Sequence, residues 1–220
     1  SALTEADEHA EALITPALQR LRPDWPVVAE EAFAREGAAT AGRVFWLVDP
    51  LDGTREFVAR NGEFTVNIAL VVGGRPRLGV VHLPVPDRLF AGLAGVGAWQ
   101  VRGGHREAIR ARPQPAGGAV VACSRAHGDG PAMEDWLRGE KVAAQTPAGS
   151  SLKFGLLACG EADLYPRFGR TMEWDTAAGQ AVLEAAGGSV CSLAGQPLRY
   201  GKPGVEIPHF VARGAPAAGG

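Results

Sequence analysis

The chain has 220 residues, enough for one large domain or two small ones, and its 46% hydrophobic content excludes global disorder. With 22 basic against 24 acidic residues, the charge balance argues against a broad surface for nucleic-acid polymers, although a local pocket could still bind a small anion. Three scattered cysteines and the lack of an apolar run of about 18 residues predict reduced, mostly buried thiols and no transmembrane segment. No signal peptide is recognisable, so we expect a cytoplasmic protein, either dissolved or peripheral to the inner membrane.

The first half of the chain predicts a helix followed by a series of strands. In chain order we expect a helix over residues 3–21 that Pro16 kinks or breaks, strands at 27–29 and 43–48, a short helical turn after Thr54, and strands at 64–72, 77–83, 88–93 and 97–101. Glycine and proline turn signals separate the last four strands. We therefore expect these strands to pair antiparallel.

The sequence RPQPAGGA at residues 112–119 is rich in proline and glycine, which makes it the best candidate for a domain boundary. Beyond it we expect strands at 120–124, 141–145, 162–166, 189–193 and 205–211, alternating with helices at 131–137, 150–159 and 176–186. This alternation is typical of an α/β fold. We therefore predict an α+β domain over residues 1–113 and an α/β domain over residues 114–220.

The stretch WLVDPLDGTREF, residues 46–57, runs an apolar strand directly into two aspartates, Asp49 and Asp52. Carboxylates this close repel one another unless a cation lies between them. Hard oxygen ligands in a turn suit Mg²⁺, and the backbone carbonyl of Leu51 could join such a set. The alternative is a plain Asp-Pro-x-Asp-Gly turn whose carboxylates accept local amides, and this stretch alone does not decide between the two.

Acidic residues stand at three further ends of predicted elements, and each has a simple structural alternative. Glu30 and Glu31 follow the strand at 27–29 and, taken alone, would form a solvated pair. Asp7 lies in a T-x-x-D pattern typical of a helix cap, and Asp175 precedes a small-residue helix that it could cap. Together with the aspartate pair they form four acidic clusters at element ends, where α/β proteins usually carry their sites.

Three segments, VVAEE from residue 27, WLVDPLDGTREFVARNGEFTVNIALV from residue 46 and EWDTAAGQAVLEAAGG from residue 173, resemble the lithium-sensitive, magnesium-dependent phosphatase superfamily that includes inositol monophosphatase. The segments REFVARNGEFTVNIALV, GSSLKF, LYPRFG and EWDTAAG are closer to its bacterial 3′(2′),5′-bisphosphate nucleotidase branch. The resemblance covers nearly the whole chain. It implies the layered αβαβα sandwich of the inositol monophosphatase and fructose-1,6-bisphosphatase type.

The resemblance implies a role for each acidic cluster of the first predicted domain and for Asp175. A cluster of two or three Mg²⁺ ions would be held by Glu30, Asp49, the Leu51 carbonyl, Asp52 and Asp175. Asp7 and Thr54 would activate the attacking water, and Glu30 belongs to the same catalytic set. The backbone amides of Gly53 and Thr54 would receive the reacting phosphate.

The second predicted domain would complete the substrate site. In the nucleotidase branch, the matching positions bind the second phosphate, the ribose and the nucleoside, which assigns substrate binding to Ser124, His127, Ser150, Lys153, Arg167 and Asp175. Arg125, between Ser124 and His127, belongs to the same segment, where the branch contacts the nucleoside. Lysine and arginine suit a phosphate that is not being cleaved. The alternatives are exposed surface charges at Lys153 and Arg167, and an ordinary loop at the end of a strand for residues 124–127.

The resemblance implies hydrolysis of the 3′-phosphate of adenosine 3′,5′-bisphosphate to AMP and phosphate, with 3′-phosphoadenylyl sulfate as a further substrate. It also implies dependence on Mg²⁺, inhibition by Li⁺ and a place in sulfur metabolism. One alternative is an inositol-monophosphatase-like or broad sugar phosphatase with the same metal residues. A nucleotide-binding sensor without turnover is a second alternative, against which the intact acidic set argues. We expect a monomer or a homodimer.

The chain departs from the family pattern at its start. Family members carry an N-terminal helix before the T-x-x-D segment, whereas this chain begins almost at that segment. Either the preceding residues are missing here or this version is trimmed. We therefore expect the segment that carries Asp7 to be loosely held.

Overall fold

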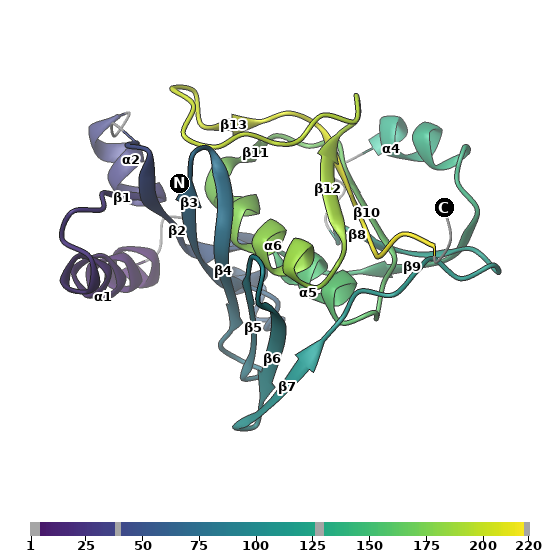
Figure 1. Ribbon diagram of the computed structural model, residues 1–220, viewed down its shortest axis with the longest axis horizontal. Helices are drawn as coiled ribbons and strands as arrows, with labels where there is room; N and C mark the ends of the chain where they lie inside the picture. Colours follow the sequence, from purple (N-terminus) through teal and green to yellow (C-terminus); the bar gives the residue numbers. More distant parts are fainter. Residues whose placement is uncertain (1–4, 38–40, 126–129, 218–220) are drawn as a thin grey trace.

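The computed structural model describes residues 5–37, 41–125 and 130–217 (Figure 1). The helices in these ranges are α1 (Glu5–Leu21), α2 (Glu30–Glu36), α3 (Thr54–Val58), α4 (Gly130–Leu137), α5 (Leu152–Ala158) and α6 (Glu173–Ala185). The strands are β1 (Val27–Ala29), β2 (Val44–Asp52), β3 (Thr65–Val72), β4 (Arg75–Leu83), β5 (Arg88–Leu93), β6 (Gly97–Arg102), β7 (His105–Ile109), β8 (Ala119–Cys123), β9 (Val142–Pro147), β10 (Leu164–Arg167), β11 (Thr171–Met172), β12 (Ser189–Ser192), β13 (Glu206–Ile207) and β14 (Phe210–Arg213).

Two large sheets organise the chain. The first has seven strands in the order β1 to β7, with β1 parallel to β2 and the remaining pairs antiparallel, which confirms the predicted antiparallel pairing. The second has five strands in the order β12-β14-β10-β8-β9. Helices α5 and α6 lie between the sheets, α1 and α2 lie outside the first, and α4 lies outside the second (Figure 1). The layered α/β fold is therefore confirmed. Within the described residues, no helix combines the length and apolar character needed to cross a bilayer.

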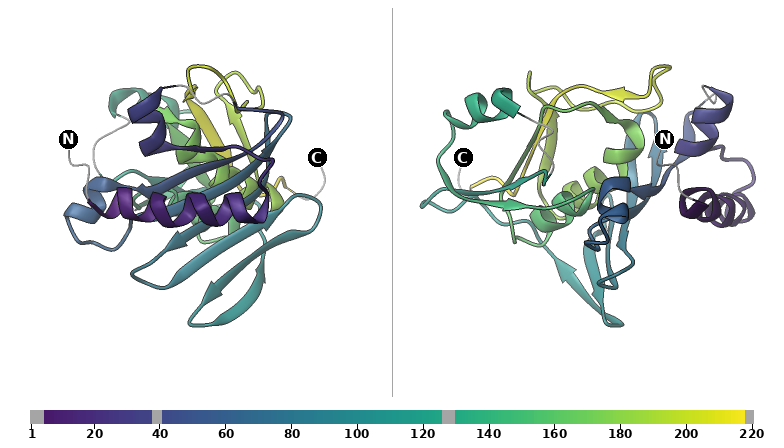
Figure 2. Two further views of the ribbon diagram at one scale, coloured as in Figure 1. Left: turned by 90° about the vertical axis from the view of Figure 1, so that its left-hand side faces the viewer. Right: turned by 180° about the vertical axis from the view of Figure 1, so that it is seen from behind.

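Strand β2 is buried on both faces, which explains its continuous apolar sequence. Phe45 and Leu47 point into the main core between the sheets. Trp46 and Val48 pack on the other side in a smaller cluster with Leu18 of α1, which crosses the outer face of the sheet (Figure 2). The strand is therefore held rigidly from both sides up to its acidic end.

Helix α6 lies directly on the first sheet because its contact residues are small. A Cβ atom added at Gly79 of β4 would lie 2.1 Å from the carbonyl oxygen of Ala178 in α6, so no larger residue fits there. Ala177, Ala178 and Ala181 are all buried in this contact layer. The close approach fixes the N-terminal end of α6 relative to the end of β2.

Several elements differ from the sequence predictions. Helix α2 and the strands β7 and β11 were not expected, and Pro16 lies within a continuous α1 that it does not break. The single strand predicted at 205–211 is wrong: β13 pairs with β11, whereas β14 joins the five-stranded sheet. Pro208 separates them because proline has no N–H to continue a ladder. All three cysteines are free, as expected, and each is partly buried.

Candidate active site

A β-bulge at the end of β2 brings Asp49 and Asp52 to the same side of the sheet. Asp49 lies opposite Asn67 and Asp52 opposite Thr65, so three steps along β2 match two along β3. In a regular strand, residues three apart face opposite sides, and the additional residue corrects this. Pro50 is tolerated there because a bulge needs no N–H at that position.

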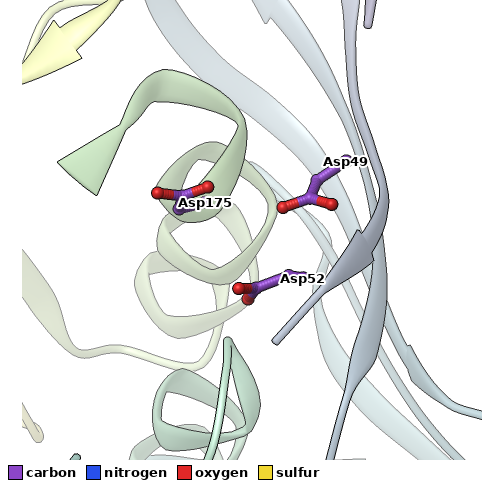
Figure 3. Close-up of side chains that lie close together, drawn as sticks. All are labelled: Asp49, Asp52 and Asp175. Carbon is purple, nitrogen blue, oxygen red and sulfur yellow. The ribbon is translucent and has the colours of Figure 1, made fainter. Parts of the chain in front are cut away.

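Asp175 faces this pair from the first turn of α6 (Figure 3). One carboxylate oxygen from each of the three aspartates lies within 4.8 Å of the other two. The helix begins at Glu173, so the prediction that Asp175 precedes it is wrong. Asp175 is instead its third residue, and its Oδ2 accepts a hydrogen bond of 2.8 Å from the Met172 backbone N–H. The carboxylate therefore caps the helix and is fixed in orientation toward the pair.

Glu30 lies beside the three aspartates because β1 runs parallel to β2. Ala29 pairs with Val48, so the residues that follow them, Glu30 and Asp49, emerge at the same edge. Glu30 is also the first residue of α2. Leu51 lies between the two aspartates and is buried, and its N–H donates to Asp49 Oδ1 at 3.0 Å.

The pKa values of Glu30, Asp49 and Asp175 are all raised in this cluster. Burial, followed by the charge of Asp175, raises the pKa of Glu30 to about 8. Burial, followed by the charge of Asp52, raises the pKa of Asp175 to about 7. The same two causes raise the pKa of Asp49, which is 1% exposed, well above its usual range. A site that makes ionised carboxylates this unfavourable is suited to a cation that would neutralise them.

Asp52 is oriented by residues that sequence reasoning missed. Its Oδ2 accepts hydrogen bonds from Thr65 Oγ1 and Asn67 Nδ2, both at 3.3 Å. It also accepts from the N–H and the Oγ of Ser151, at 2.7 and 2.9 Å. These contacts fix the orientation of the Asp52 carboxylate. The sequence signal for Ser151 was its place in GSSLKF, but within that segment only Ser150 and Lys153 were predicted to bind substrate.

Asp7 lies next to Glu31, the residue that follows Glu30 of the carboxylate cluster. It belongs to α1 and is 3% exposed, contrary to the expectation of a loosely held segment. Burial, followed by the charge of Asp7, raises the pKa of Glu31. Glu11 Oε2 accepts the Glu31 N–H at 3.0 Å and so connects α1 to α2. Thr4, the expected capping partner of Asp7, lies outside the described residues.

A tight turn follows the acidic end of β2. Gly53 has φ of 91°, a left-handed conformation that favours glycine, and it precedes the first residue of α3, Thr54. A Cβ atom at Gly53 would lie 3.1 Å from the Cβ of Ser150. The glycine therefore lets the backbone approach the second half of the chain closely.

A cavity of about 460 Å³ opens beside this turn. Of the residues predicted to bind substrate, those that line it are Gly53, Thr54, Ser124, Ser150, Lys153, Arg167 and Asp175. Asp52 lines the same cavity, so the cavity adjoins the aspartate cluster. Arg125 is not among the lining residues, and His127 lies outside the described residues. Arg55 and Arg170 also line the cavity and were not predicted.

The two cations of the second half are built into the cavity wall. Lys153 is 3% exposed, so its alternative interpretation as a surface charge is wrong. Its Nζ donates to the carbonyls of Ala148 and Ser150, at 3.1 and 2.7 Å. Arg167 is half-buried, which also disagrees with an exposed charge, and its Nη1 donates to Ser124 Oγ at 3.0 Å. Both side chains are therefore held in place before any ligand binds.

Ser150 is outside the helix that was predicted to begin with it. It has φ of 42° and precedes α5, which starts at Leu152. A non-glycine residue in this region is strained, and such strain often marks functional sites. The Ser150 Oγ donates to the carbonyl oxygen of Glu63 at 2.5 Å, which offsets part of that cost.

The raised pKa values predict an unusual pH dependence of stability without metal. Because the pKa values of Glu30 and Asp175 rise on folding from 4.5 and 3.8 to about 8 and about 7, the folded state binds more protons in this interval. The free energy of unfolding in EDTA should therefore fall as pH rises through this interval, and the stability should be retained at pH values below it. Melting temperatures across this range would show it, with Asp175→Asn less pH-dependent than wild type. A wild-type curve that rises with pH relative to the variant would contradict the prediction.

Comparison with known proteins gives the family context of this site. The sequence pattern of the inositol monophosphatase family matches residues 1–217. The chain is 46% identical over 200 residues to the 3′(2′),5′-bisphosphate nucleotidase CysQ of Escherichia coli strain K12, covering 91% of this chain and 80% of that protein. It is 40% identical to the CysQ of Buchnera aphidicola subsp. Acyrthosiphon pisum, covering 90% of this chain and 74% of the relative.

Solved structures show the same relationship. The crystal structure of CysQ from Bacteroides thetaiotaomicron matches with a TM-score of 0.83 and 36% identity, over 96% of this chain and 84% of that one. Inositol monophosphatase from Anabaena matches with a TM-score of 0.78 and 27% identity, over 97% of this chain and 83% of that one. Sequence pattern, relatives and fold agree, and the chain belongs to the inositol monophosphatase family.

Proposed function

We propose that this chain is a Mg²⁺-dependent phosphatase that removes the 3′-phosphate of adenosine 3′,5′-bisphosphate and releases AMP and phosphate. The observation that carries the proposal is one cavity lined by two chemically different sets of side chains. They are the carboxylates Asp52 and Asp175, which we call the acidic end, and the cations Lys153 and Arg167, which we call the cationic end. Its relatives named 3′(2′),5′-bisphosphate nucleotidase, at 46% and 40% identity, support it. We propose 3′-phosphoadenylyl sulfate, which carries the same 3′-phosphate, as a second substrate.

The acidic end would hold two or three Mg²⁺ ions. The proposed ligands are Glu30, Asp49, the Leu51 carbonyl, Asp52 and Asp175. The fit is chemical, because crowded oxygen donors without thiol or imidazole partners are the set that Mg²⁺ prefers. When bound, the ions would neutralise phosphate charge and lower the pKa of a water molecule.

The chain's own residues would position the reacting groups. The backbone N–H groups of Gly53 and Thr54, at the turn before α3, would receive the phosphate. Asp7 and Thr54 would orient the water and accept its proton, with Glu30 in the same catalytic set. Phosphoryl transfer depends mainly on such positioning and on charge stabilisation, so no side-chain nucleophile is needed.

The cationic end would select the substrate class. Ser124, Ser150, Lys153 and Arg167 would bind the ribose and the phosphate that is not cleaved. An inositol or sugar monophosphatase also needs the acidic end, but its substrate has no second phosphate for these cations to neutralise.

Phosphate release from adenosine 3′,5′-bisphosphate and from inositol monophosphate, each with Mg²⁺ and with EDTA, tests this function. We expect hydrolysis of the bisphosphate that requires Mg²⁺ and a much lower kcat/KM for the inositol ester. Hydrolysis that survives chelation would contradict the metal assignment. A preference for inositol monophosphate would instead support the alternative phosphatase.

Lithium should inhibit the enzyme, an expectation that rests on family resemblance. Li⁺ is small and hard, so it can take the place of a Mg²⁺ ion, but it carries only one of the two charges. Bisphosphate hydrolysis should therefore fall as LiCl is added and remain unchanged with NaCl at equal concentration. Equal, weak effects of the two salts would count against the prediction.

A further inference from the structure

Glu63 lies beside the cavity, in contact with the turn at Gly149 and Ser150 that lines it. It precedes β3, and its side chain is 19% exposed. Its Oε2 accepts hydrogen bonds from the Gly149 N–H and from Arg125 Nε, both at 2.8 Å. Its Oε1 accepts a second bond from Arg125, and its backbone carbonyl accepts the Ser150 Oγ. One residue of the first half of the chain therefore binds two separate segments of the second half.

The first of these segments leads to the acidic end of the cavity. Gly149 and Ser150 form the strained turn before α5, and both contact Glu63. The next residue, Ser151, donates its N–H and Oγ to Asp52 Oδ2. A movement of this turn would therefore change how Asp52 is presented to a cation.

The second segment leads to the cationic end. Arg125 follows Ser124, whose Oγ accepts a bond from Arg167 at 3.0 Å. The Arg125 guanidinium is engaged by Glu63 and by the Pro147 carbonyl at 3.3 Å, and Arg125 is absent from the residues that line the cavity. The paired guanidinium lowers the pKa of Glu63, so its carboxylate stays charged near neutral pH.

We propose that Glu63 is a positioning residue that sets both ends of the cavity, and that Arg125 acts through Glu63 rather than as a ligand of the substrate phosphate. The inference rests on the proposed nucleotidase function. Removing Arg125 disturbs mainly the Ser124 side: it loses its bond to the Pro147 carbonyl, but the bonds from Gly149 and Ser150 to Glu63 do not involve Arg125. Removing the Glu63 side chain disturbs both sides.

Kinetics of Glu63→Ala, Glu63→Gln and Arg125→Gln on adenosine 3′,5′-bisphosphate test this asymmetry. The matched control is Arg138→Gln, which removes an exposed arginine that pairs with Asp135 near α4. For Arg125→Gln we expect KM to rise about ten-fold with kcat nearly unchanged. For Glu63→Ala we expect the same rise in KM, a fall in kcat of about ten-fold and a higher Mg²⁺ concentration for half-maximal rate.

Glu63→Gln keeps the size of the side chain and an amide oxygen that can still accept the Gly149 N–H, so it should recover much of the kcat lost in Glu63→Ala. Glu63 variants with the kinetics of Arg138→Gln would overturn the inference. So would equal losses of kcat in Arg125→Gln and Glu63→Ala, or losses that follow the melting temperature alone. Wild-type protein that fails to hydrolyse the bisphosphate would instead overturn the proposed function, so the two failures are distinguishable.

Discussion

Asp49→Asn and Asp175→Asn are each expected to lower kcat by orders of magnitude while the protein remains folded. The substitution keeps the shape of the side chain but removes a charge from the group that would hold Mg²⁺. Folding should not suffer, because burial and the charge of Asp52 raise the pKa of both carboxylates, so their ionised forms oppose folding. In EDTA at neutral pH or above, both variants should melt at the same temperature as wild type or higher.

Steady-state hydrolysis and thermal melting, each with Mg²⁺ and with EDTA, would measure the two effects together. Asp135→Asn is a suitable control because this aspartate has 74% of its side chain exposed and lies in α4, outside the cavity lining. It should leave kcat unchanged. The prediction is wrong if Asp49→Asn turns over like the control, or if its loss of activity only reflects unfolding.

Lys153→Ala and Arg167→Ala are expected to lower kcat/KM for the bisphosphate by about ten- to a hundred-fold, since charge-assisted hydrogen bonds contribute roughly 1.5–3 kcal/mol each. Both side chains line the cavity and are held by bonds to neighbouring protein groups. They are therefore preorganised to meet a phosphate. Slow hydrolysis of a monophosphate, such as inositol monophosphate, should hardly change in the same variants, because it has no second phosphate to lose contact with.

The comparison of the two substrates in each variant is the measurement that matters. Lys153 also supports the Ala148 and Ser150 carbonyls, so its removal has a structural component that melting temperatures would reveal. Arg138→Gln again serves as the exposed cation control. Parallel losses on both substrates would show that the cations serve the reacting phosphate or the fold. The general sugar phosphatase would then become the better assignment.

The sequence by itself determined the class of fold and most of the candidate residues. Alternation of strands and helices after residue 112 predicted the α/β half, and turn signals predicted the antiparallel strands before it. These are local patterns, in which hydrophobic period and turn residues act over a few positions. The acidic pair in Asp-Pro-x-Asp-Gly was visible for the same reason.

Only the tertiary structure decided how those residues meet. The β-bulge that turns Asp49 and Asp52 to one side depends on the register with β3, and Glu30 is placed by the parallel register of β1. Asp52 is oriented by Ser151, which is 99 residues away along the chain. Strand register and hydrogen bonds across such distances arise from packing of the whole chain, so no local pattern encodes them. The same reason explains why Lys153 looked like a surface charge in the sequence and is buried in the fold.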